Sequence, residues 1–222
     1  MTKDRVRQQI LDVGIVPVVR AASPQQAILA AEAVAAGGIP IVEITMTVPG
    51  AIEVIAQLTQ SIGSQVLIGA GTVLDAATAA RCFEAGAEFL VSPGFDPATI
   101  ELAKESDKLV MPGALTPTEV ITAYKAGADF VKIFPCGNVG GPSYIKALKA
   151  ALPQIPMIPT GGVNLATAAE FLRAGASALG IGGELVSRKE LEAGNAAAIT
   201  AAARQYIAIV RDAREGGQAH VA

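Results

Sequence analysis

Short apolar runs alternate with alanine-rich segments along the chain, and this alternation is what most constrains the fold. Each run is apolar on both faces, as expected of parallel strands that helices cover on both sides. Helix-start signals lie between the runs, among them SPQQ (23–26) and TPTE (116–119), each of which offers a capping box. The eight runs are GIVPVVR (14–20), PIVEITM (40–46), VLIGAGT (66–72), FLVSPG (89–94), LVMPGAL (109–115), FVKIFP (130–135), MIPTGG (157–162) and ALGIGG (178–183).

A recurring Ala-Gly pair ends the helical segments. In four such pairs the glycine is Gly37, Gly86, Gly127 or Gly175, at spacings of 49, 41 and 48 residues. Each interval holds two strand–helix units of about 23 residues, with glycine expected at the helix C′ position.

Eight such units without a long linker predict an α/β fold, with residues 1–222 forming a single (β/α)8 TIM barrel. A doubly wound open sheet is the alternative. A last helix is expected over about 195–214, with a loose tail from about residue 215.

Composition narrows the partners of the chain. Apolar residues make up 51% of the sequence and charged residues 17%, which is typical of a globular α/β protein. The net charge of −3 provides no basic surface, so we expect no nucleic-acid partner. No apolar run reaches the ~18 residues of a membrane span, and the N-terminus has no apolar signal core. The expected location is therefore cytoplasmic, without a membrane partner.

Few residues are available for metal or histidine chemistry. Cys82 and Cys136 lie far apart in the sequence, and the only histidine is His220. No Cys/His zinc set and no histidine-based nucleophile can be assembled from them. We expect two reduced core cysteines, no metal site, and chemistry carried by Lys, Glu, Asp, Arg, hydroxyl and backbone groups.

Two charged residues interrupt apolar strands. Lys132 lies in FVKIFP and Glu43 in PIVEITM, at similar depths in the sixth and second runs, which face each other across an eight-stranded barrel. One interpretation is a structural ion pair, or one side chain turned outward. The other is functional, because burial lowers a lysine pKa and a neutral amine forms a Schiff base with a ketone. With Glu43 as general base, this pair predicts a keto-acid lyase or aldolase.

Two glycine pairs indicate a phosphate site. They follow the seventh and eighth runs, where barrel loops often bind phosphate through backbone N–H groups, although glycines also serve ordinary turns. The four residues are Gly161, Gly162, Gly182 and Gly183.

Further candidates lie at the same strand ends. Arg20 ends the first run and suits a carboxylate or phosphate, or is simply a surface charge. Thr72 and Thr160 end the third and seventh runs and offer hydroxyl groups. Pro93 and Phe134 are expected either to line the pocket or to belong to the core.

These residues resemble the 2-keto-3-deoxy-6-phosphogluconate (KDPG) aldolase family, which includes 4-hydroxy-2-oxoglutarate aldolases. The resemblance extends from about residue 14 to 190. The matching blocks, in order, are VEITMTVP, GAGTV, VSPG, MPGALTPTE, FVKIFP, PTGGV and GIGG.

The resemblance implies a cofactor-free class I aldolase that reversibly splits KDPG into pyruvate and glyceraldehyde 3-phosphate. Lys132 matches the Schiff-base lysine and Glu43 the general acid/base, while Thr72 and Thr160 match residues around the pyruvyl group. The glycine pairs match the phosphate loops. The related reaction splits 4-hydroxy-2-oxoglutarate into pyruvate and glyoxylate. The implied partners are small keto acids and aldehydes, and the implied assembly is a homotrimer.

Two positions depart from the family pattern. Many relatives carry arginine where this chain has Thr47, and Arg20 is expected to supply the missing cation. Glu184 follows GIGG, where a small hydroxyl residue is common. A carboxylate there would repel phosphate, so either Glu184 points away or the preferred substrate is unphosphorylated.

Two rival functions remain open at the level of sequence. A phosphate-binding epimerase or isomerase would use Glu43 as base and would form no imine with pyruvate. A non-catalytic barrel that serves as a scaffold would show neither turnover nor imine formation.

Overall fold

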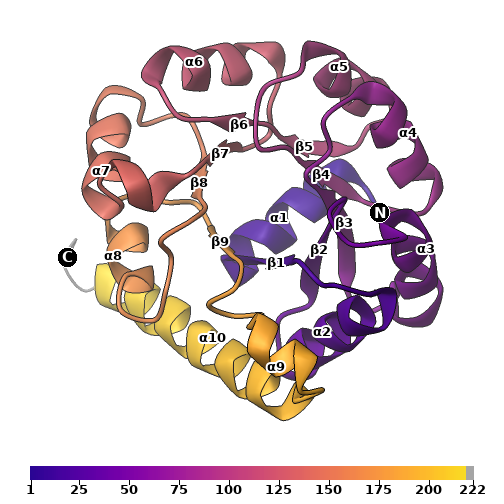
Figure 1. Cartoon of the computed structure of the whole chain (residues 1–222). Coiled ribbons are helices and arrows are strands. Elements are labelled where there is room, and N and C mark those ends of the chain that lie inside the picture. The colour runs from indigo at the N-terminus through magenta and orange to yellow at the C-terminus, as the bar shows by residue number, and fades with distance from the viewer. Residues whose placement is uncertain (219–222) are drawn as a thin grey trace.

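Parallel strands surrounded by helices form the computed structural model of the protein, which describes residues 1–218 (Figure 1). The strands are β1 (Ile15–Val19), β2 (Ile41–Thr45), β3 (Leu67–Gly71), β4 (Phe89–Val91), β5 (Leu109–Met111), β6 (Gly113–Ala114), β7 (Val131–Ile133), β8 (Met157–Pro159) and β9 (Leu179–Ile181). The helices are α1 (Lys3–Val13), α2 (Pro24–Ala36), α3 (Ala51–Ile62), α4 (Ala76–Glu84), α5 (Pro97–Glu105), α6 (Pro117–Ala126), the 3₁₀ helix η1 (Cys136–Val139), α7 (Pro142–Ala151), α8 (Ala168–Arg173), α9 (Arg188–Glu192) and α10 (Ala196–Gln218).

The strands form two parallel sheets. One has the order β5-β4-β3-β2-β1-β9 and the other the order β6-β7-β8, and every pairing within them is parallel. The fifth apolar run is divided into β5 and β6 at Pro112, which has no N–H to donate. At the other junction a bridge between Thr160 and Gly180 connects the end of β8 to β9. The predicted α/β class with parallel strands is confirmed.

Local sequence signals explain where several helices begin. At α6 the capping box is complete, because the Glu119 N–H donates to Thr116 Oγ1 and the Thr116 N–H donates to Glu119 Oε2. At α2 the predicted box is only half formed. Ser23 Oγ accepts from the Gln26 N–H, but the Gln26 side chain accepts from the N–H of Ala22 instead of Ser23.

Glycines end three helices as predicted and a fourth with a shift. Gly86, Gly127 and Gly175 have φ of 101°, 106° and 101°, the left-handed conformation that glycine adopts without a Cβ penalty. The prediction for Gly37 was wrong, because its φ is −79° and the next residue, Gly38, has φ 95°. Helix α2 therefore turns one residue later than expected.

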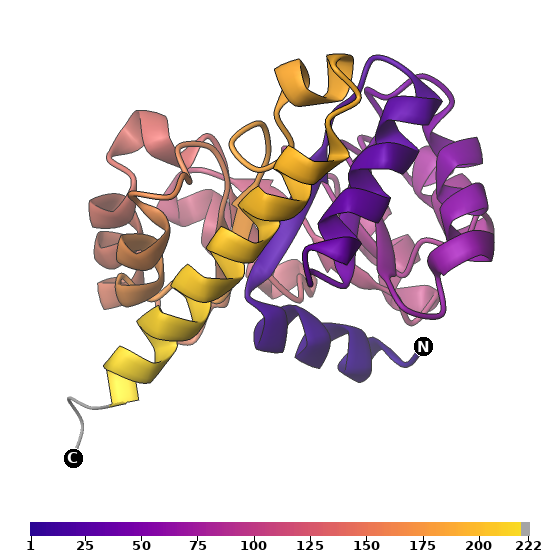
Figure 2. The same ribbon diagram turned by 90° about the horizontal axis from the view of Figure 1, so that it is seen from below.

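Helices α1 and α10 lie at the outside of the strand layer. Figure 2 shows α1 crossing beneath the N-terminal ends of the strands, whereas α9 lies at the opposite end, where the strands finish. Helix α10 continues to Gln218, beyond the expected end near 214. The rest of the predicted loose tail, residues 219–222 with His220, lies outside the described residues.

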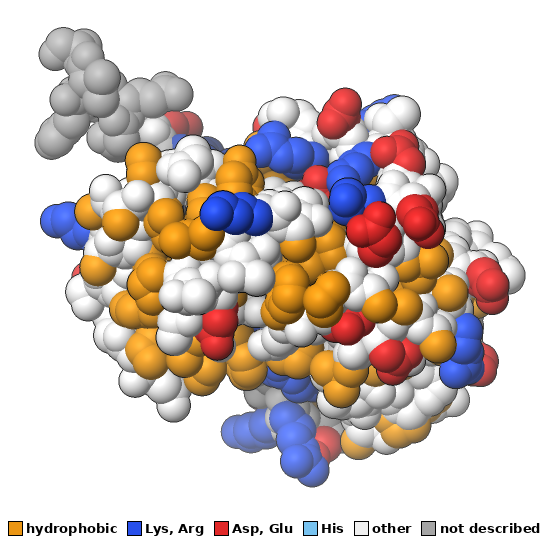
Figure 3. All heavy atoms as spheres, turned by 90° about the horizontal axis from the view of Figure 1, so that it is seen from above, with side chains coloured by type: hydrophobic (Ala, Val, Ile, Leu, Met, Phe, Trp, Pro, Cys, Tyr) orange, Lys and Arg blue, Asp and Glu red, His pale blue; other side chains and the backbone are white. Residues whose placement is uncertain are grey.

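Buried side chains from the strands and inner helix faces form one continuous cluster. Cys82 and Cys136 belong to it as free thiols, which confirms the prediction of reduced core cysteines. The edge of the molecule with α5 and α6 appears in Figure 3, where hydrophobic side chains lie among acidic and basic groups. Within residues 1–218, no helix is both long and apolar enough to cross a bilayer.

Candidate active site

Glu43 and Lys132 are buried in the middle of their strands, with exposed fractions of 2% and 3%. Glu43 pairs in register with Val18 of β1 and Gly69 of β3, and Lys132 with Gly113 of β6 and Ile158 of β8. Both side chains are buried, and each charge affects the pKa of the other, so the two groups lie close enough to interact. The structure thus brings together the two residues that the sequence singled out.

The interior changes the protonation of both groups. Burial lowers the pKa of Lys132, against the opposing effect of the Glu43 carboxylate, and Arg20 lowers it further. Burial raises the pKa of Glu43, while Lys132 and Arg20 act in the opposite direction. Both shifts favour the neutral forms, which are a nucleophilic amine and a carboxylic acid able to donate a proton.

Glu43 and Lys132 do not form a direct ion pair among the side chains of the described residues. Glu43 Oε1 is buried without a hydrogen-bond partner, and Lys132 Nζ lies 5.1 Å from the centroid of the Phe134 ring. In a structural ion pair the carboxylate and the ammonium group would bond to each other. Here the Glu43 carboxyl and the Lys132 amine are not bonded to each other, so both remain available to a ligand. The geometry therefore argues against a purely structural pair.

Because Lys132 is buried, the free energy of unfolding is expected to depend on pH. Its folded-state pKa lies below the ordinary 10.5, so between those two values the unfolded chain binds more protons than the folded one. Stability should therefore rise with pH through this window and be reduced below it, by about 1.4 kcal/mol for each pKa unit of the shift. The Lys132→Met variant lacks this pH-dependent contribution to the free energy of unfolding. Urea unfolding of the unsubstituted protein and of Lys132→Met from pH 7 to 10.5, at one protein concentration, measures the contribution. A constant difference between them would contradict the prediction.

Gly71 at the end of β3 explains how the Glu43 carboxylate fits. A Cβ at this position would overlap the Glu43 side chain, so only glycine leaves room for the carboxylate. Sequence reasoning did not single out Gly71 as a site residue. Its position in GAGT, one residue before Thr72, is a signal that could have identified it.

Arg20 is exposed at the end of β1 but lies close to the site. A Cβ built on Gly182 would be 3.2 Å from Arg20 Nη1, so the guanidinium lies over the loop after β9. Its charge also lowers the pKa of both Glu43 and Lys132. Arg20 thus lies against the glycine loop and its charge reaches the buried pair, so it is not an isolated surface charge.

Glycine occurs in the two loops for different structural reasons. Gly161 and Gly162 have φ of 85° and 80°, so both need the left-handed backbone. A Cβ on Gly162 would lie 2.6 Å from the Cα of Gly137, so the two glycines pack closely. The sequence analysis did not identify Gly137, although it lies in CGNVGG, directly after FVKIFP. A Cβ on Gly183 would meet nothing within 4 Å, so the loop after β9 has open space above it.

Three of the hydroxyl residues lie at strand ends. Thr160 is buried and pairs with Gly180 across the junction of the sheets. Thr72 has φ 58°, a conformation that a β-branched residue rarely adopts outside constrained sites. Thr47 is exposed, with its Oγ1 2.6 Å from Oγ1 of Thr45. Because Thr45 donates its proton to the Val19 carbonyl, Thr47 is the donor of that bond.

Pro93 and Phe134 are partly buried. The Pro93 carbonyl lies against Gly113, and the Phe134 ring lies near Lys132 Nζ.

Glu184 is exposed. Burial raises the pKa of Tyr206 to about 12, and the charge of Glu184 contributes less to the same shift. The Glu184 carboxylate therefore affects the pKa of a residue of α10.

In the part of the chain that the structure describes, no group of three or more His, Cys, Asp or Glu side chains is arranged to hold a metal ion.

Comparison with known proteins identifies relatives along most of the chain. A family profile described as "KDPG and KHG aldolase" matches residues 6–202. The 2-dehydro-3-deoxy-phosphogluconate aldolase of Treponema pallidum (strain Nichols) is 35% identical over 89% of this chain and 94% of its own. The KHG/KDPG aldolase of Escherichia coli (strain K12) is 33% identical over 90% of this chain and 94% of its own.

A solved structure agrees with these matches. It is the KDPG aldolase of Legionella pneumophila with pyruvate captured at low pH as a covalent carbinolamine intermediate. This structure superposes with a TM-score of 0.83 at 29% identity and covers 89% of this chain and 96% of its own. Profile, sequence and structure therefore each match most of the chain, and the chain belongs to the KDPG and KHG aldolase family.

Proposed function

We propose that this chain is a class I aldolase that reversibly cleaves KDPG into pyruvate and glyceraldehyde 3-phosphate through a Schiff base on Lys132. The observation that carries the proposal is the buried Lys132, whose pKa is lowered and which shares its interior with an unpartnered Glu43 carboxylate oxygen. A pyruvate carbinolamine in the Legionella pneumophila relative supports the same chemistry.

In the proposed mechanism the neutral Lys132 amine attacks the C2 ketone to give a carbinolamine. Glu43 donates a proton to the departing hydroxyl, and loss of water leaves the iminium. The Glu43 carboxylate then removes the C4 hydroxyl proton as the C3–C4 bond breaks. The electrons of the C3–C4 bond pass into the iminium to form an enamine. The aldehyde leaves, Glu43 returns a proton to C3, and hydrolysis of the iminium releases pyruvate and the free lysine.

Residues around the pair support substrate binding in this proposal. Thr72 and Thr160 lie at strand ends near the pyruvyl half, and Pro93 and Phe134 line the same side. Arg20 and the loops with Gly161, Gly162, Gly182 and Gly183 supply donors for an anionic group. Of the two possibilities for Glu184, the proposal adopts the one in which its exposed carboxylate points away from a bound phosphate.

A second substrate is 4-hydroxy-2-oxoglutarate, which would give pyruvate and glyoxylate. The observation that favours it is the E. coli relative, which is named for both activities. The pyruvyl half is common to both substrates, so the Lys132 and Glu43 chemistry is unchanged.

The proposal extends to architecture and assembly. The Thr160–Gly180 bridge and the single-residue interruption at Pro112 support one closed (β/α)8 barrel as a single catalytic domain. The homotrimer implied by the family resemblance and the cytoplasmic location stay predictions.

Turnover tests the function directly. We expect purified protein to release pyruvate from KDPG with saturation kinetics, detected by a coupled lactate dehydrogenase reaction. We expect EDTA to leave the rate unchanged, because lysine supplies the electron sink. An inactive protein that has the correct circular dichroism spectrum would contradict the proposal. Release of pyruvate from 4-hydroxy-2-oxoglutarate alone would restrict it to that substrate.

A further inference from the structure

Thr45 ends β2 with a buried hydroxyl that the proposed mechanism does not use. Its side chain lies on the same face of the strand as Glu43, because residues two apart on a strand point the same way, and it is 0% exposed. Its Oγ1 donates to the Val19 carbonyl at 2.9 Å and accepts from Thr47 Oγ1 at 2.6 Å. The two bonds form a chain that runs from the loop after β2, through Thr45, to the end of β1.

A turn after β2 brings the two threonines together. The Val48 N–H donates to the Thr45 carbonyl at 3.0 Å, which closes a four-residue turn over 45–48. The turn places the Thr47 hydroxyl against that of Thr45, into which it donates. This second bond holds the Thr45 hydroxyl in the orientation that directs its own proton to the Val19 carbonyl.

The Val19 carbonyl belongs to the peptide unit that leads into Arg20. A peptide unit is planar, so the direction of this carbonyl fixes where the Arg20 Cα lies. The pairing of β1 with β2 ends at Val19 and Ile44, and β1 itself ends at Val19. The hydroxyl bond therefore extends the connection between β1 and β2, which lie side by side in Figure 1, beyond their last paired residues.

Little else directs the Arg20 side chain. Among the described residues its guanidinium takes part in no ion pair, and the residue is exposed. On its outer side it lines, with Arg188 of α9, a cavity of about 230 Å³, so there is room for other side-chain directions. In the direction that the structure shows, Arg20 Nη1 lies over Gly182. From there its charge acts on Glu43 and Lys132.

We propose that Thr45 is a positioning residue of this site, whose hydroxyl fixes the Val19–Arg20 peptide and thereby aims the Arg20 guanidinium at the substrate. Thr47 supports this role because it holds the hydroxyl in place. The proposal rests on the proposed aldolase function, in which Arg20 supplies donors for an anionic group. Because the hydroxyl acts through Arg20, its loss should reduce activity only while the guanidinium is present.

The test is a double-mutant cycle between Thr45→Val and Arg20→Met, with kcat/KM for KDPG cleavage as the readout. We expect Thr45→Val to lower kcat/KM about tenfold, the upper end of the net effect of one hydrogen bond, and to raise KM more than it lowers kcat. In the Arg20→Met background we expect the same substitution to lower kcat/KM less than about twofold, because no guanidinium is left to position. An equal loss in both backgrounds, or no loss in either, would overturn the proposal.

Two further variants separate positioning from folding. Thr45→Ser keeps the hydroxyl and should retain kcat/KM within about twofold of the unsubstituted protein. Thr47→Val removes only the outer bond of an exposed side chain, so it tests the proposal even if Thr45→Val does not fold. We expect Thr47→Val to lower kcat/KM about threefold, and this loss to disappear in the Arg20→Met background. A loss in Thr45→Ser as large as in Thr45→Val would contradict the role of the hydroxyl.

Thr200→Val is the matched control. The Thr200 hydroxyl donates to the Ala33 carbonyl at 2.8 Å and connects α10 with α2, so the variant loses the same kind of bond away from the site. We expect its kcat/KM to be unchanged. A loss equal to that of Thr45→Val would show that any such bond between elements has this effect, and the specific role of Thr45 would fail.

Crystal structures of the unsubstituted protein and of Thr45→Val test the positioning without any measurement of activity. We expect the Arg20 guanidinium over Gly182 in the first and displaced from it in the second. The same Arg20 direction in both would overturn the proposal, whether or not KDPG is cleaved. If the unsubstituted protein forms no pyruvyl adduct with borohydride but Arg20 moves in Thr45→Val, the aldolase function fails and Thr45 still directs Arg20.

Discussion

Replacement of Lys132 with alanine is expected to abolish covalent trapping of pyruvate. Incubation with pyruvate and borohydride should add one reduced pyruvyl group to the unsubstituted protein and none to Lys132→Ala. The reason is that imine formation needs a neutral amine at the ketone, and burial lowers the pKa of this lysine within an interior that excludes water. Intact-protein mass spectrometry measures the adduct, and KDPG cleavage should fall below detection in the same variant.

The control for this experiment is Lys125→Ala. Lys125 is exposed on α6, so its replacement makes the same chemical change without removing a buried group. We expect this variant to form the adduct as the unsubstituted protein does. An adduct that persists in Lys132→Ala would assign the imine to another lysine. If the folded unsubstituted protein forms no adduct, Lys132 is a structural charge and the epimerase and scaffold interpretations gain support.

Replacement of Glu43 with glutamine is expected to slow proton exchange at the pyruvate methyl group by about 10²- to 10⁴-fold, the usual contribution of a positioned general acid/base. Glutamine keeps the size of the side chain beside Gly71 but cannot accept or donate the transferred proton. Exchange of pyruvate in deuterium oxide, followed by proton NMR, measures the rate. Borohydride trapping at Lys132 should persist at a reduced rate, because the amine itself is intact.

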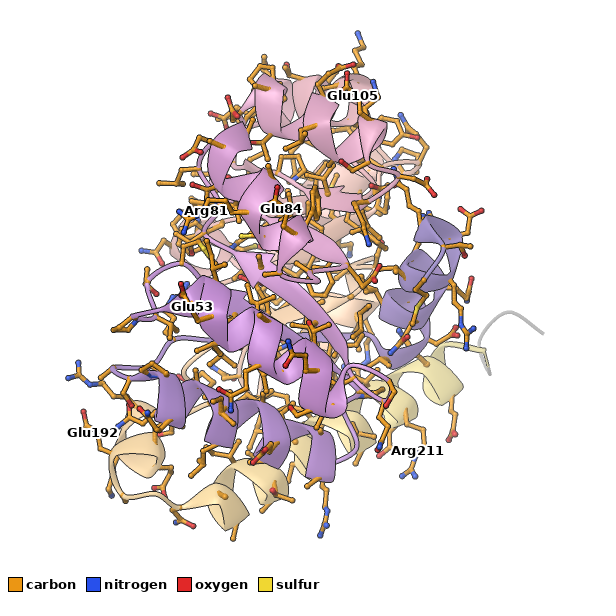
Figure 4. All side chains as sticks on the ribbon, turned by 90° about the vertical axis from the view of Figure 1, so that its right-hand side faces the viewer. Glu53, Arg81, Glu84, Glu105, Glu192 and Arg211 are labelled. Atoms are coloured by element: carbon orange, nitrogen blue, oxygen red, sulfur yellow. The ribbon has the colours of Figure 1, made fainter. Side chains whose placement is uncertain are left out.

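Glu53→Gln is the matched control, since it makes the same chemical change on the outer face of α3, where Figure 4 shows Glu53 at the surface. We expect exchange at the unsubstituted rate in this variant. Normal exchange in Glu43→Gln would remove Glu43 from its proposed role and leave a bound water or another group as the base.

Several features could be predicted from sequence because they depend on local pattern. The parallel α/β class follows from apolar runs that alternate with capped helices, and each of the eight runs contains a strand. Lys132 and Glu43 stand out because charged residues are rare within such runs. The glycine pairs are recognisable from sequence because they directly follow the seventh and eighth runs. The error at Gly37 was a choice between adjacent glycines, which the sequence pattern alone does not distinguish.

Other features depend on contacts between residues far apart in the chain. Gly71 makes room for the Glu43 carboxylate, and Gly137 packs on Gly162, yet neither glycine differs in sequence from an ordinary turn residue. That Glu43 and Lys132 share an interior without a direct ion pair depends on side-chain directions that strand spacing does not specify.

The sequence by itself determined the order of strand and helix, the family resemblance and the two residues expected to carry the chemistry. Periodicity and residue type are sufficient for these, because each is a property of a short segment. Only the tertiary structure decided that Arg20 lies over Gly182 and that Arg188 joins it around one cavity. These placements follow from how the first strand and the helix after the last strand come together, and the strand order of the sheets sets that proximity.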